Sequence, residues 1–140
     1  MRRFVHVLAA AAFVAGPAAA APPAAARCPI AVDFASRCCG PDQASMRAIR
    51  SLLESRRFRS VRAEAYGWGL EGESTLCLHP GAAREKRLAE LKRIAAAATP
   101  PANVPPPQIR LDEDLRGTFR GQLREPRMGA RGWPELGSPP

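Results

Sequence analysis

The stretch CPIAVDFAS, residues 28–36, decides the fold because its apolar side chains alternate along the chain. Ile30, Val32 and Phe34 fall on one face, and small or acidic residues fall on the other. Alternation with a period of two residues is typical of a strand that is buried on one face. The sequence therefore predicts a strand here, with its apolar face turned toward a layer of other elements.

The segments that follow continue the pattern of strands and amphipathic helices. Asp42 is a suitable N-cap for a helix over 43–56, whose apolar residues form one stripe. Two further alternating runs, 61–69 and 74–80, surround a glycine-containing turn and predict two more strands. A last amphipathic helix is predicted over 82–97.

The predicted order is strand, helix, strand, strand, helix. It indicates a disulfide-stabilised α+β domain over residues 28–97, with both helices on one face of a sheet. One more strand would make this the ferredoxin-like topology; that strand could come from the tail or be absent. A domain of about 70 residues has a thin core, so covalent cross-links would be useful to it.

The N-terminal residues have the composition of an export signal. Arg2 and Arg3 precede the apolar run FVHVLAAAAFVAG, and small residues up to Ala20 offer a cleavage site. We expect a Sec-type signal peptide over 1–20, a linker over 21–27, and a periplasmic or secreted protein. The apolar run is shorter than the roughly 20 residues of a membrane helix, so we expect no transmembrane segment after cleavage.

The C-terminal residues are rich in proline and arginine. Nine of the fifteen prolines fall within residues 100–140, and apolar residues are sparse there. We predict a Pro-rich linker and a disordered basic tail over 98–140. Within it, LRGTFRGQLREP repeats a unit every four residues; as a strand, it would place Leu115, Phe119 and Leu123 on one face, suited to adding to a sheet edge.

Four cysteines in an exported chain favour disulfide bonds. The first interpretation is two structural disulfides among Cys28, Cys38, Cys39 and Cys77. A ferredoxin-like arrangement would bring Cys28 near Cys77; the alternative joins Cys28 to Cys38 or Cys39 and leaves Cys77 to the other. The first pairing has one difficulty, since Cys28 has the parity of the inward-facing Ile30 whereas Cys77 points outward.

Two further hypotheses assign chemistry to the adjacent cysteines. Cys38 and Cys39 precede a predicted helix, whose N-terminus would lower a thiol pKa. With Cys77 and His79, which share a strand face, they would form a copper or zinc site. The other hypothesis is a thiol-redox role, although the chain has no Cys-x-x-Cys motif.

The sheet face opposite the predicted helices is expected to be open. Arg62, Tyr66 and Trp68 lie on it, and exposed aromatic side chains are suited to anchoring a partner. We expect partner capture by this face together with the repeat at 115–126. The competing interpretation is that the tail or a second copy covers these residues.

Charge and composition limit the function classes. The net charge is +8, or +6 without Arg2 and Arg3. For an exported protein, this favours a protein or an acidic envelope component as partner and disfavours nucleic acid. After signal cleavage His79 would be the sole histidine, and no Gly-x-Ser-x-Gly turn is present, which disfavours a hydrolase. We expect a non-enzymatic binding or accessory protein without a cofactor, of undetermined oligomeric state.

Overall fold

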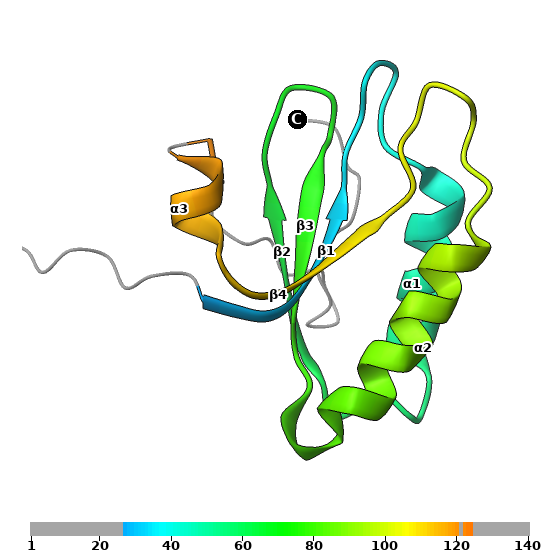
Figure 1. Ribbon diagram of the computed structural model, residues 1–140, viewed down its shortest axis with the longest axis vertical. Helices are drawn as coiled ribbons and strands as arrows, with labels where there is room; N and C mark the ends of the chain where they lie inside the picture. Colours follow the sequence, from blue (N-terminus) through cyan, green and yellow to red (C-terminus); the bar gives the residue numbers. More distant parts are fainter. Residues whose placement is uncertain (1–26, 121, 125–140) are drawn as a thin grey trace, which may run out of the picture.

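A computed structural model describes residues 27–120 and 122–124. The predicted signal peptide and the residues from 125 onward lie outside this range. The described chain forms a small α+β domain with a four-stranded antiparallel sheet in the order β2-β3-β1-β4 (Figure 1). The strands are β1 Arg27–Phe34, β2 Arg62–Gly67, β3 Ser74–His79 and β4 Gln108–Asp114; the helices are α1 Gln43–Glu54, α2 Arg84–Ala97 and α3 Leu115–Phe119, with a 3₁₀ turn η1 Gly81–Ala83.

The predicted α+β class is confirmed, and each predicted strand and helix of 28–97 is present within a few residues of its expected ends. The start of α1 shows why the local prediction succeeded. Asp42 Oδ1 accepts hydrogen bonds from the backbone N–H groups of Ala44 and Ser45, at 3.0 and 3.3 Å. These bonds satisfy donors that the first turn of a helix would leave unpaired.

The prediction of a disordered tail is wrong for the residues just after the proline-rich linker. Residues 108–114 form β4, which pairs with β1 along an edge of the sheet. Residues 115–119 form the helix α3, so the predicted strand face of Leu115 and Phe119 is also wrong. An edge strand is stabilised mainly by its backbone hydrogen bonds to the neighbouring strand, so its sequence needs little alternation of apolar residues. Its sequence, QIRLDED, therefore gave only a weak signal.

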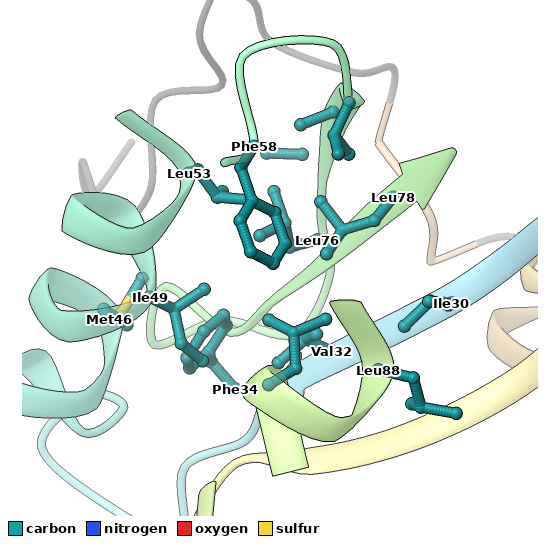
Figure 2. Packing of buried hydrophobic residues seen from close by; sticks show 14 residues of the cluster. Ile30, Val32, Phe34, Met46, Ile49, Leu53, Phe58, Leu76, Leu78 and Leu88 are labelled. Atoms are coloured by element: carbon teal, nitrogen blue, oxygen red, sulfur yellow. The ribbon is translucent and has the colours of Figure 1, made fainter. Parts of the chain in front are cut away.

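The main core lies between the sheet and the pair α1 and α2, and α3 lies on the opposite side of the sheet (Figure 1). Figure 2 shows Ile30, Val32 and Phe34 of β1 facing this core, as their alternation predicted. Phe58, which the sequence analysis did not include, is also fully buried because the loop after α1 folds it inward. The core is completed by Met46, Ile49, Leu53, Val61, Ala63, Ala65, Leu76, Leu78, Leu88 and Leu91.

Regular alternation in β1 breaks at Pro29. The ladder between β1 and β4 omits the pair of Pro29 and Asp112, and Asp112 has a φ of 54°. Arg84, at the start of α2, donates to the Pro29 carbonyl oxygen at 3.2 Å and to Asp112 Oδ2 at 2.8 Å. A proline and a left-handed residue both interrupt a strand ladder, and Arg84 satisfies the polar groups that this interruption exposes.

The break at Pro29 explains how Cys28 reaches Cys77. Although Cys28 has the parity of Ile30, its side chain belongs to the cluster on the opposite sheet face, with Cys77. The two cysteines form a disulfide, with their Cα atoms 5.4 Å apart and a sequence separation of 49 residues. Closing a loop of this length stabilises the fold by about 4 kcal/mol in the chain-entropy model.

The contribution of residues 108–119 to the stability of the domain can be tested by substituting two leucines. Leu115→Ala should lower the free energy of unfolding by about 2–4 kcal/mol, because Leu115 is fully buried, whereas Leu111→Ala should change it by less than about 1 kcal/mol, because Leu111 is 42% exposed. Urea denaturation followed by circular dichroism measures both. Equal and small effects would mean that 108–119 is not part of the folded domain.

Candidate functional site

The second sheet face is covered by Leu115, Phe119 and Leu123, which follow β4 in the chain. Tyr66 is only 8% exposed and Leu115 is fully buried. Phe119 and Leu123 pack against the same cluster, which also contains Cys28, Ala31 and Cys77. Of the side chains expected to capture a partner, Arg62 remains exposed, whereas Tyr66 and Leu115 are used inside the domain. The structure therefore agrees with the competing interpretation, in which residues of the tail cover this face.

Trp68 takes part in the same internal packing. Its ring stacks on Phe119 with centroids 4.8 Å apart and planes 20° apart. The guanidinium of Arg110 lies 5.5 Å from the centroid of the Phe119 ring. Stacking and cation–π contacts of this kind each contribute about 0.5–1.5 kcal/mol. The contacts of Phe119 with Trp68 and Arg110 thus hold α3 against the sheet.

Beneath this stack runs a chain of polar contacts. Trp68 Nε1 donates to Thr75 Oγ1 at 3.0 Å, and Thr75 Oγ1 donates to Asp33 Oδ1 at 2.5 Å. Arg110 Nε donates to Asp33 Oδ2 at 2.6 Å. Partial burial opposes the charge of Arg110, but the hydrogen bond and negative charge of Asp33, with a smaller effect of Glu113, raise the Arg110 pKa above its ordinary value. Because its polar groups are paired, this network is structural.

Removing Arg110 tests that conclusion. Arg110→Gln should lower the free energy of unfolding by about 2–3 kcal/mol, because it leaves the buried Asp33 carboxylate without its cation. The matched control is Arg93→Gln on the exposed side of α2, which should be neutral within about 0.5 kcal/mol. Thermal unfolding of both variants gives the comparison. If the two losses are equal, Arg110 is not a structural partner of Asp33.

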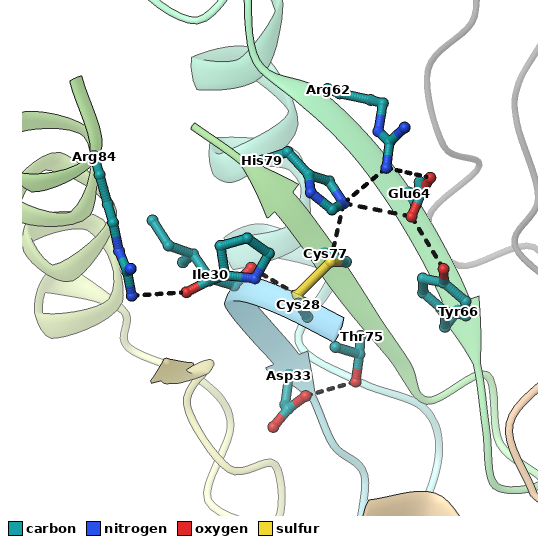
Figure 3. The surroundings of a disulfide bond; sticks show 11 residues. Cys28, Ile30, Asp33, Arg62, Glu64, Tyr66, Thr75, Cys77, His79 and Arg84 are labelled. Carbon is teal, nitrogen blue, oxygen red and sulfur yellow. Dashed lines mark hydrogen bonds and ion pairs between the residues drawn. A yellow bond between two sulfur atoms is a disulfide. The ribbon is translucent and has the colours of Figure 1, made fainter. Parts of the chain in front are cut away.

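Polar side chains surround the disulfide on the β2 and β3 side (Figure 3). His79 Nε2 lies 3.6 Å from Cys77 Sγ and 3.6 Å from Glu64 Oε2. Tyr66 donates its hydroxyl hydrogen to Glu64 Oε2 at 3.0 Å. Arg62 borders this group: its Nη2 lies 3.3 Å from both Glu64 Oε1 and His79 Nε2.

The loop after β1 contains the other two cysteines. Cys38 and Cys39 are free, and Cys39 is exposed. A left-handed turn at Cys39 and Gly40, with φ values of 69° and 93°, leads into α1. A hydrogen bond that the Cys38 thiol donates to Cys39 and the negative charge of Cys39, with smaller effects of burial and of Glu71, raise the pKa of Cys38. The predicted lowering of this thiol's pKa by the helix is therefore outweighed by its neighbour.

Two hollows adjoin this loop. The larger, of about 540 Å³, is lined by residues of 38–44 and of 99–104. The smaller, of about 370 Å³, is lined by residues of 39–43 and by the hairpin tip at 70–72. Leu70 at that tip is 89% exposed. Solvent and small ligands therefore have access to the two thiols.

The structure does not bring the four predicted metal ligands together. Cys77 and His79 share one face of β3, as expected. In the register, however, Cys77 lies opposite Ala31, whereas Cys38 follows the far end of β1 beyond Phe34. The interpretation of two disulfides also does not match the structure, in which Cys28 and Cys77 are bonded and Cys38 and Cys39 are free.

Two residues of these sites were not among the predicted site residues. The alternation of the predicted strand places Glu64 on the face of Arg62 and Tyr66, but it was not counted as a possible metal ligand. Arg110 could not be predicted, because its strand was assigned to the tail.

Comparisons with known proteins add no relative: no protein-family model, curated protein or solved structure matches the chain. In the part of the chain that the structure describes, no helix has both the length and the apolar character needed to cross a membrane. The function must therefore be inferred from the site itself.

Proposed function

We propose that this is an exported, non-enzymatic protein that binds copper(I) through the thiols of Cys38 and Cys39. The observation that carries the proposal is the division of the cysteines: one pair is bonded inside the domain, and the adjacent pair is free in an exposed loop. Soft thiolate ligands favour copper(I).

The loop has two features that suit metal capture. Cys38 and Cys39 are adjacent in the chain, both are free, and both line the same hollow, so both sulfurs can meet one ion. The hollows on either side leave room for the ion to approach. A thiol-redox role has less support, because the raised pKa of Cys38 lowers its thiolate fraction and a bond between adjacent cysteines is a strained ring.

We further propose a ferredoxin-like topology and an exported location for the domain. The strand order β2-β3-β1-β4 and the helices between β1 and β2 and between β3 and β4 support the topology. The composition of residues 1–20 supports export, and the internal disulfide is compatible with an oxidising compartment.

Copper(I) affinity tests the proposal directly. The purified protein, mixed anaerobically with copper(I) and a chromophoric chelator as competitor, should bind one ion per chain. Cys38→Ser and Cys39→Ser should each weaken binding by at least about 100-fold, because each removes a ligand. Gln43→Ala, which alters the lining of both hollows without removing a thiol, is the control. Unchanged affinity in the serine variants would refute the proposal.

The raised pKa of Cys38 predicts how that affinity depends on pH. Below its pKa the thiol carries a proton that the metal must displace, so the apparent affinity should rise about tenfold per pH unit for each proton released. Because the pKa is raised, this rise should continue through neutral pH. The competition assay repeated between about pH 6 and pH 8 measures it, and a pH-independent affinity would contradict thiolate binding.

A further inference from the structure

A second group of potential metal ligands lies on the covered sheet face, away from the Cys38–Cys39 loop. Glu64 and Cys77 are directly opposite each other in the pairing of β2 and β3. His79 follows Cys77 by two residues, so both side chains project from the same face. Cys28 joins the group through its bond to Cys77. Strand pairing thus brings two sulfurs, an imidazole and a carboxylate together (Figure 3).

The spacing of these atoms is close to that of a tetrahedral zinc site. Zinc–sulfur bonds of about 2.3 Å and zinc–nitrogen bonds of about 2.0–2.1 Å imply ligand atoms about 3.5 Å apart for sulfur with nitrogen. His79 Nε2 lies 3.6 Å from Cys77 Sγ. The ligand atoms of Glu64, Cys77 and His79 all lie within 4.8 Å of one another. These three ligand atoms are therefore already close to the spacing of a zinc site, and Cys28, bonded to Cys77, supplies the fourth.

We propose that these four residues, Cys28, Glu64, Cys77 and His79, form a zinc site that opens only when the disulfide is reduced. A dithiol reductant passes two electrons and two protons to the disulfide, which yields two thiols and the oxidised form of the reductant. A zinc ion then displaces the two thiol protons to solvent and binds both thiolates, with His79 and Glu64 as its other ligands. The disulfide and the metal are thus alternative cross-links between β1 and β3.

The surroundings of the group suit this exchange. Two thiolates and a carboxylate around a divalent ion leave one negative charge, which Arg62 can balance from 3.3 Å. The hydroxyl of Tyr66 already orients Glu64, as hydrogen-bond partners of metal ligands do. The side chains of His79 and Glu64 are 26% and 23% exposed, so the ion can approach from their side although both sulfurs are buried.

The test uses the purified Cys38→Ser/Cys39→Ser protein, so that it is independent of the proposed copper site. The protein is reduced with dithiothreitol, freed of it by anaerobic gel filtration, and titrated with zinc. Native mass spectrometry should show one zinc per chain after reduction and none before it. His79→Gln and Glu64→Gln, added to this background, should each weaken zinc binding by at least about tenfold. Glu85→Gln, on the exposed part of α2, should leave it unchanged.

Circular dichroism of the reduced, metal-free protein keeps the test decisive. If reduction unfolds the chain, zinc should refold it, because ligand binding and folding would then be coupled. The proposal is overturned if the reduced protein takes up no zinc, if zinc does not refold an unfolded chain, or if His79→Gln binds zinc as before. Any of these results together with intact copper(I) binding by the unsubstituted protein would leave the proposed function standing.

Discussion

The pairing of β1 with β3 is the constraint on which the other features depend. Its register, with Ile30 opposite Leu78, turns one set of alternating side chains toward α1 and α2. The same register puts Cys77 beside the start of β1, where Cys28 can reach it, and sends Cys38 past the opposite end. One set of backbone hydrogen bonds therefore divides the cysteines between a structural bond and a free pair.

A sheet in a chain this short has two faces to protect from water, and two helices cover only one. The segment that follows β4 covers the other: Leu115 is buried there, and Phe119 stacks between Trp68 and Arg110. Aromatic side chains that look suited to a partner are thereby used within the domain. The free thiols are in the Cys38–Cys39 loop, where two hollows meet the surface.

Features that depend on local sequence could be predicted, and those that depend on tertiary pairing could not. Alternation defined β1, and Asp42 marked the start of α1, because period and capping are properties of adjacent residues. A further strand from the tail was left open, but β4 could not be located, because an edge strand with one exposed face needs few apolar residues. The direction of the Cys28 side chain could not be predicted either, because it depends on the break in the strand at Pro29. That break involves residues of other elements: Asp112 of β4, which has a positive φ, and Arg84 of α2, which donates hydrogen bonds to Pro29 and Asp112.

The most direct test of the account is to map the cysteine connectivity of the protein isolated from its native cells without reductant. Free thiols are alkylated under acid quench, the protein is digested without reduction, and the peptides are identified by mass spectrometry. The account predicts a peptide linked through Cys28 and Cys77, and alkylated Cys38 and Cys39. A peptide that links Cys38 or Cys39 to Cys28 or Cys77 would contradict it, because no free thiol pair would then remain in the loop.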